Sequence, residues 1–239
     1  NHKPEFDAFA YRNKKMLEFT RCEPENDTGN PSTPTIAIPR ALIFWQLLPL
    51  FGTFFKQLGF NVALSGATDK CTIRRGLEHI TAQTCFPVKV AFGHIAELLE
   101  ENPDHLFLPS IVSMKSAFEE NPHNQLCPYV QSLPYQIRTA FSEIAEKTEF
   151  LSPVMRLGDG GKLERKSFHK IGKQLGVAKS EIHNALKAAN KAQKKFEEEL
   201  KTKGREMLSQ LKPGENLFVL VSRPYNGCDE GVNLGLAAK

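Results

Sequence analysis

The sequence has no closely spaced cysteines. Its 239 residues include only five, and none forms a C-x-x-C pair. They are Cys22, Cys71, Cys85, Cys127 and Cys228. An odd number of widely spaced cysteines does not make the complete disulfide framework of a small secreted domain. The pattern therefore favours free thiols in a reducing cytoplasm.

The chain also lacks the glycine-rich loops that bind phosphates in nucleotide-binding proteins. Neither G-x-x-x-x-G-K-[ST] nor G-x-G-x-x-G occurs. Residues 158–162 read Gly-Asp-Gly-Gly-Lys, but no strand leads into them at the spacing that such a loop requires. We interpret this segment as a joint between two parts of the chain.

No apolar run is long enough to span a membrane. The most apolar stretch, residues 41–55, is shorter than the roughly 20 residues required, and Gln46, Pro49 and Gly52 interrupt it. The first residues are polar and do not form a signal peptide. The net charge of +4 is too small to indicate nucleic acid or an anionic membrane as a partner. With 41% hydrophobic residues, the composition predicts a soluble globular protein.

Apolar strands and helices alternate from residue 35 onward. The expected strands cover residues 35–39, 61–66, 105–109 and 149–153. The expected helices cover residues 40–58, 69–78, 85–101 and 127–147, with a loop at 110–125. A strand, a helix and a returning strand of this length form a right-handed parallel unit. The pattern predicts an α/β fold with a doubly wound, mostly parallel sheet.

Composition divides the chain into four sections. Residues 1–34 are polar and predict an N-terminal arm or linker. Residues 35–157 form the first α/β lobe, and residues 158–212 form a basic helical connector. Residues 213–239 begin a second α/β lobe with a buried strand at 217–221, and the pattern breaks off there. We therefore expect the chain to be part of a longer polypeptide.

Two thiols stand at the expected N-termini of helices. Cys85 precedes Phe86-Pro87 and Cys127 precedes Pro128, and proline is favoured in the first turn of a helix. A helix N-terminus favours the thiolate, which is the form that binds metals. Thiolates suit iron–sulfur clusters or zinc. The two positions predict a metal site, and two buried structural cysteines are the alternative.

Other residues near these helices are candidates for ligand binding. Cys71 and Cys228 lie in segments that follow strands, so each is a candidate for an additional metal ligand. Arg40 begins the first helix, where it is placed to bind phosphate or carboxylate, although a solvated arginine is equally consistent. Arg223 follows the last strand in the same way. His94 lies about two helical turns after the first thiol, where it would contact a ligand or pack internally.

Residues 168–186 suggest a different class of function. They have the spacing of a helix-turn-helix, with Gly176 at the turn and basic residues around it. The second helix continues well beyond the length of a recognition helix, which favours an ordinary helical hairpin joining two lobes. A DNA-binding regulator is therefore the less favoured alternative.

Several short motifs together resemble a known family. They are Ile38-Pro39-Arg40-Ala41-Leu42, Cys85-Phe86-Pro87-Val88-Lys89 with Gly93-His94, Phe107-Leu108-Pro109, Cys127-Pro128-Tyr129-Val130-Gln131 and Arg223-Pro224-Tyr225-Asn226. Over about residues 35–239 the chain resembles the acyl-CoA dehydratase activase-related proteins of the DUF2229 type. These are relatives of the 2-hydroxyacyl-CoA dehydratase and benzoyl-CoA reductase subunits. Phe92 stands where the family pattern has histidine.

The resemblance implies an iron–sulfur cofactor. A 4Fe-4S or related cluster would be bound by Cys85 and Cys127, and the third ligand stays open between Cys71, Cys228 and a residue beyond Lys239. An open iron site can act as both Lewis acid and electron donor.

The same resemblance implies a function in anaerobic metabolism. The chain would support ATP-linked transfer of a low-potential electron to a CoA-thioester-type substrate, as a component of a 2-hydroxyacyl-CoA dehydratase-like or double-cubane-type reductase. Its expected partners are an ATP-dependent activase domain or subunit, an acyl-CoA substrate and the second lobe of the parent polypeptide. Arg40 and His94 are the expected substrate-binding residues. The alternative is a non-catalytic, cluster-binding accessory that relays electrons.

Overall fold

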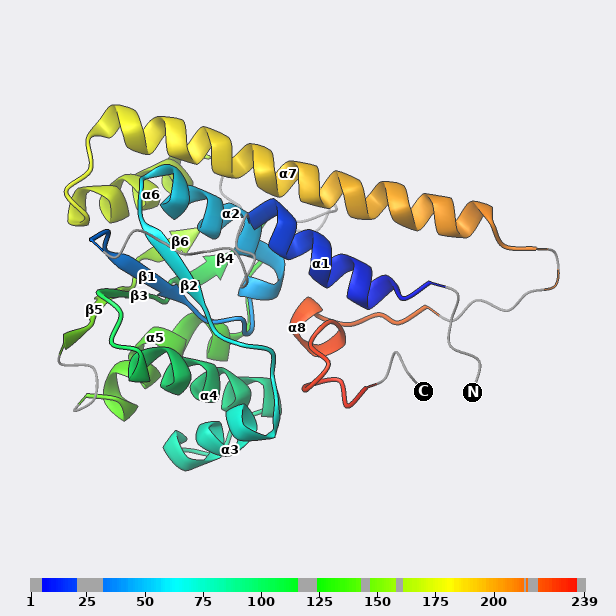
Figure 1. Cartoon of the computed structure of the whole chain (residues 1–239), viewed down its shortest axis with the longest axis horizontal. Coiled ribbons are helices and arrows are strands. Elements are labelled where there is room, and N and C mark those ends of the chain that lie inside the picture. Colours follow the sequence, from blue (N-terminus) through cyan, green and yellow to red (C-terminus); the bar gives the residue numbers. More distant parts are fainter. Residues whose placement is uncertain are drawn as a thin grey trace.

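A four-stranded parallel sheet lies at the centre of the fold (Figure 1). The structure is a computed structural model that describes residues 6–20, 32–115, 124–142, 147–157, 161–212, 214 and 219–235. The strands, in their order across the sheet, are β2 (Asn61–Leu64), β1 (Thr35–Ile38), β3 (His105–Phe107) and β5 (Glu149–Leu151). All neighbouring pairs are parallel, so the predicted fold class is confirmed.

Helices cover both faces of this sheet, as Figure 1 shows. On one face lie α2 (Phe44–Gln57), α6 (Lys162–Gln174) and α7 (Lys179–Ser209). On the other lie α3 (Lys70–His79), α4 (Phe86–Glu100) and α5 (Pro128–Ala140). Because both faces are covered, the strands have no solvent side, which explains why β1 is a continuous apolar run rather than an alternating one.

Helix α2 provides most of the aromatic core. Phe51 packs edge-to-face against Phe107 of β3, with ring centroids 4.9 Å apart, and Phe54 packs against Phe168 of α6 at 4.7 Å. The helix is buried between the sheet and α7, which agrees with the interpretation of residues 41–55 as a core helix. Within the described ranges, no helix is both long and apolar enough to cross a membrane.

Two further strands form a small parallel pair that the sequence analysis missed. They are β4 (Ser110–Ser113), in the expected loop at 110–125, and β6 (Val154–Arg156). Pro109 and Pro153 precede them and lack the N–H group that a continuous ladder needs. The Ser110 N–H donates to the Pro153 carbonyl at 2.9 Å, so the second pair continues directly from the first sheet.

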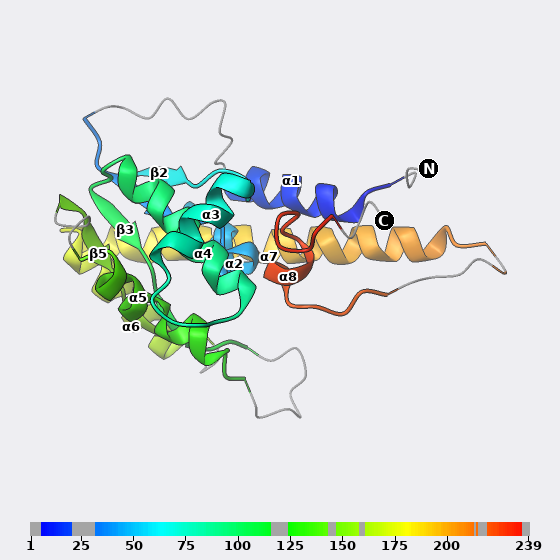
Figure 2. The same cartoon turned by 90° about the horizontal axis from the view of Figure 1, so that it is seen from below.

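The N-terminal section contains a helix, α1 (Ala8–Thr20), where an arm or linker was expected. Both views place α1 alongside α7 (Figures 1 and 2). Met16 is buried, and the Arg12 guanidinium donates to the Trp45 carbonyl of α2. The sequence analysis missed this helix because polar side chains make many of its contacts, so it has no clear apolar stripe. Examples are Tyr11 with α7, Arg12 with α2 and Asn13 with the Cys228 carbonyl.

The expected buried strand at 217–221 is not borne out where the structure describes it. Val219, Leu220 and Val221 lie outside any strand and are 74%, 50% and 91% exposed, while residues 217 and 218 lie outside the described residues. No described strand pairs with them, so their apolar side chains have no sheet in which to be buried. The chain then forms the short helix α8 (Pro224–Gly227).

The connector is helical, as predicted, and packs against the first lobe. Helices α6 and α7 are joined at Gly176, whose φ of 73° suits the left-handed turn. The Gln193 side chain of α7 donates to the Gln46 carbonyl of α2 at 3.0 Å. The expected helix-turn-helix region therefore contains a helical hairpin whose second helix runs on along α2.

Helices α3 and α4 approach each other closely at two glycines. A Cβ atom at Gly76 would lie 1.9 Å from the Lys89 carbonyl oxygen, and one at Gly93 would lie 1.8 Å from the Thr72 carbonyl oxygen. The obstructing atoms belong to the backbone, so they cannot turn aside as a flexible side chain would. This contact fixes the position of α4, which carries Cys85 at its N-terminus.

We expect Gly93→Ala to lower the free energy of unfolding by about 2 kcal/mol or more, because the added methyl group overpacks this contact. Gly204→Ala is the matched control: this residue lies in helix α7 with no atom near its Cβ position, so alanine should stabilise the protein by about 0.5–1 kcal/mol. Urea unfolding measures both changes. Equal stability of Gly93→Ala and the unaltered protein would contradict the close packing.

Candidate functional site

The candidate site lies where the order of the parallel strands reverses. The chain passes from β1 to β2 on one side and then to β3 on the other, and ligands of such sheets bind beyond the carboxyl ends of the strands at this point. Arg40 follows β1, and its backbone N–H donates to the Ser65 hydroxyl, which follows β2, at 2.8 Å. Thr68 lies in the same loop and contacts Asp229, so the C-terminal part of the chain reaches this edge.

A buried hydrogen-bond network connects three segments there. The Thr68 hydroxyl donates to the Asp229 carboxylate at 2.7 Å and lies 2.9 Å from His94 Nε2. A hydroxyl has a single proton, so Thr68 accepts from His94, which must then carry its proton on Nε2. Nδ1 is left unprotonated and has no hydrogen-bond partner among the described residues; the Glu97 carboxylate lies 3.9 Å away.

Burial keeps His94 neutral. Its side chain is fully buried, and this desolvation, together with the positive charge of Arg40, lowers its pKa from 6.5 to about 3, although the Asp69 carboxylate acts in the opposite direction. A neutral imidazole is consistent with the tautomer that the hydrogen bonds require.

Asp229 is the charged member of the network, and the positive charge of Arg40 acts on it without a hydrogen bond. Burial raises the pKa of Asp229, while hydrogen bonds from Thr68 and two backbone N–H groups and the charge of Arg40 act against this rise. The Arg40 guanidinium lies 5.7 Å from the centre of the Trp45 ring, and its buried Nε has no hydrogen-bond partner within the described part of the chain. The structure thus brings Arg40 and His94 together, and their role in binding substrate stays a prediction.

The two thiols occupy equivalent positions in two helices. Cys85 is the N-cap residue of α4 and Cys127 is that of α5, each with proline in the first turn, as the sequence predicted. Neither side chain caps its helix by a hydrogen bond, and neither is in a disulfide. Cys85 is exposed and Cys127 is half-buried, so both are accessible to a ligand.

The segment before and within α8 contributes two residues to the surroundings of these thiols. The Arg223 guanidinium donates to the Tyr225 hydroxyl at 2.9 Å and also lies beside the Cys127 thiol. The pKa of Tyr225 is raised, chiefly by burial and further by the charges of Cys127 and Cys85, while Arg223 opposes the rise. The charges of both thiols therefore act on one tyrosine, although the thiols belong to different helices.

The remaining cysteines do not extend this pair. Cys228 is buried against α1, where Asn13 donates to its backbone carbonyl, and burial raises its pKa while the charge of Arg12 opposes the rise. Cys71 lies on α3, 3.7 Å from an Arg74 nitrogen. In the part of the chain that the structure describes, no three histidine, cysteine or acidic side chains form a metal-binding group. Cys22 lies outside that part.

Sequence reasoning missed Thr68 and Asp229. Both lie in polar loops, and their partners come from distant parts of the chain, so no local pattern marks them. Arg223 and Tyr225 were identified, but as part of a second lobe; the structure places them against the first. The one sequence signal for Arg223 was its position in the loop after the expected strand at 217–221.

The burial of His94 predicts a loss of stability in mild acid. Below pH 6.5 the unfolded chain protonates this histidine, whereas the folded protein does so only near pH 3, so its contribution is complete above pH 6.5 and is lost as the pH falls. The full difference is about 5 kcal/mol, of which about 2 kcal/mol is lost between pH 7 and pH 5. Urea unfolding at pH 7 and pH 5 should show a smaller pH dependence for His94→Gln than for the unaltered protein. His183→Gln, which changes an exposed histidine of α7, is the control and should keep the pH dependence of the unaltered protein. The same pH dependence in all three proteins would contradict a buried, neutral His94.

Comparison with known proteins identifies the family. The model described as "CoA enzyme activase uncharacterised domain (DUF2229)" matches residues 35–239. No curated protein and no solved structure matches the chain. The matched region begins with β1 and includes the sheet, both thiols and α8. The resemblance inferred from the motifs is confirmed, and the chain belongs to the DUF2229 family of CoA enzyme activase domains.

Proposed function

We propose that Cys85 and Cys127 provide two thiolate ligands to an iron–sulfur cluster of the 4Fe-4S or a related type. The observation that carries this proposal is that both thiols are free and stand at the N-cap of a helix with proline in its first turn. The charges of both thiols also act on the same tyrosine, Tyr225. The partial positive charge of a helix N-terminus stabilises a thiolate. Thiolates are the protein ligands that such clusters require.

The surroundings of the thiols fit this donor set. The Arg223 guanidinium beside Cys127 offers a positive charge to an anionic group. Thr84, directly before Cys85, has a buried hydroxyl oxygen without a hydrogen-bond partner among the described residues. Hydrogen bonds to sulfur tune the potential of such clusters, so this hydroxyl has a chemical use in a loaded site.

Two thiolates do not complete the coordination. Because no third ligand joins them within the described ranges, the further ligands come from another section or from a partner polypeptide. A bound cluster would supply a low-potential electron and an open iron site. The exposed aromatic side chains next to the thiols, Phe86 and Tyr129, would exclude water once such a partner covers them.

Membership in the CoA enzyme activase family supports the wider function. The chain acts in ATP-linked electron transfer to a CoA-thioester-type substrate, together with an ATP-dependent activase. Arg40, which is partly exposed and whose charge acts on Asp229, binds an anionic group of the substrate. His94 is fully buried, so it supports the site through Thr68 and Asp229.

Anaerobic reconstitution with iron and sulfide tests the cluster site. We expect Cys85→Ala and Cys127→Ala each to lose most of the bound iron and acid-labile sulfide, because each removes one thiolate. Cys71→Ala, a thiol of α3, is the matched control and should retain both. Unchanged iron content in the first two variants would reject the ligand assignment.

Arg223→Gln tests the charge next to Cys127. Outer groups that support metal ligands typically change affinity by 10- to 100-fold, so we expect iron to bind about tenfold more weakly, measured by competition with a chelator. Arg205→Gln removes an exposed arginine from α7 and should leave the affinity unchanged. Equal affinities of the two variants would show that Arg223 does not support the thiolate.

A further inference from the structure

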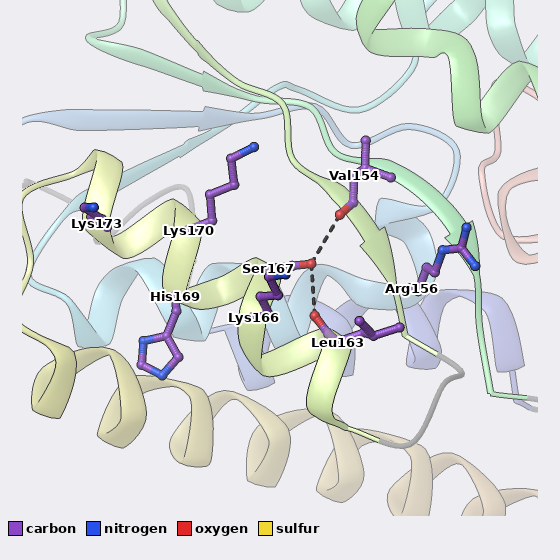
Figure 3. Close-up of a pocket in the computed structure, with 8 residues that line it drawn as sticks. All are labelled: Val154, Arg156, Leu163, Lys166, Ser167, His169, Lys170 and Lys173. Carbon is purple, nitrogen blue, oxygen red and sulfur yellow. Dashed lines mark hydrogen bonds between the residues drawn. The ribbon is translucent and has the colours of Figure 1, made fainter.

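A pocket lies between α6 and β6, and none of its residues is among the candidate ligands discussed above (Figure 3). Its volume is about 630 Å³. Ligand pockets commonly have volumes of about 300–1,000 Å³. The residues that matter for its chemistry are Val154 and Arg156 of β6 and Leu163, Lys166, Lys170 and Lys173 of α6.

One wall of the pocket is a row of lysines. Lys166, Lys170 and Lys173 follow one another at spacings of four and three residues, so they lie on the same side of α6. With a rise of about 1.5 Å per residue, the row spans roughly 10 Å. None of the three forms an ion pair with a carboxylate that the structure describes. Arg156 of β6 lines the pocket on the side of the other element (Figure 3).

Apolar side chains lie among these charges. Val154 and Leu163 are 53% and 41% exposed, although both belong to regular elements. Ser167 lies between them in Figure 3, and its hydroxyl is 3.2 Å from the Val154 carbonyl oxygen and 3.1 Å from that of Leu163. The contact with Val154 holds β6 against α6, so the pocket is formed before any ligand binds.

We propose that this pocket binds a small organic phosphate. A phosphate dianion or a diphosphate matches a row of three lysines better than a single carboxylate does. The exposed surfaces of Val154 and Leu163 fit an apolar or aromatic part of the same molecule. Concavity between two elements favours a small molecule over duplex nucleic acid, which would contact a wider surface.

A fluorescence anisotropy titration with 1-naphthyl phosphate tests this site, because the probe joins a phosphate to an aromatic ring. We expect saturable binding that inorganic pyrophosphate displaces and that 1-naphthol, which lacks the phosphate, does not reproduce. Lys170→Glu combined with Lys173→Glu should weaken binding at least tenfold. Leu163→Ser should weaken binding of the probe and leave that of pyrophosphate unchanged.

Lys201→Glu is the matched control, since it reverses an exposed charge of α7 outside the pocket and should bind the probe normally. Circular dichroism confirms that each variant is folded. The proposal is overturned if the probe does not bind saturably, or if the double variant binds as well as the control. It is equally overturned if a duplex DNA fragment binds through these lysines while the probe does not.

Discussion

The buried carboxylate of Asp229 connects the two ends of the matched region. Its hydrogen bond from Thr68 joins a loop at the edge of the sheet to a segment 161 residues later in the chain. Gly231, two residues further, approaches Thr68 so closely that a Cβ atom would lie 2.7 Å from the Thr68 carbonyl oxygen. The same C-terminal segment brings Arg223 beside Cys127, so the composition of the candidate site depends on this connection.

The two faces of the sheet are covered by helices that pack in different ways. On one face, the phenylalanine side chains of α2 are buried between the sheet, α6 and α7, where they form a close-packed apolar core. On the other, α3 and α4 touch through the backbones around Gly76 and Gly93, which holds the Cys85 end of α4 in place. A site built at helix ends needs such rigid support, because a small displacement of a ligand residue weakens binding.

Local patterns in the sequence were sufficient for much of the fold. The strands begin at residues 35, 61, 105 and 149, as their apolar runs predicted, and the helices begin directly after Cys85 and Cys127 with proline in the first turn. The small β4–β6 pair was not predicted because proline interrupts both of its parent strands. The apolar run around Val219 was wrongly expected to be buried, since burial depends on a neighbouring strand and not on hydrophobicity alone.

The sequence by itself determined the parallel α/β architecture, the family and the two thiols at helix starts, because proline, apolar runs and short motifs are local features. Only the tertiary structure decided that His94 is fully buried, that Cys228 faces α1 and that Arg223 lies against the first lobe. The same holds for the lysine-lined pocket, whose second wall comes from β6. These features depend on which distant segments meet, and desolvation and contact between such segments leave no mark on the local sequence.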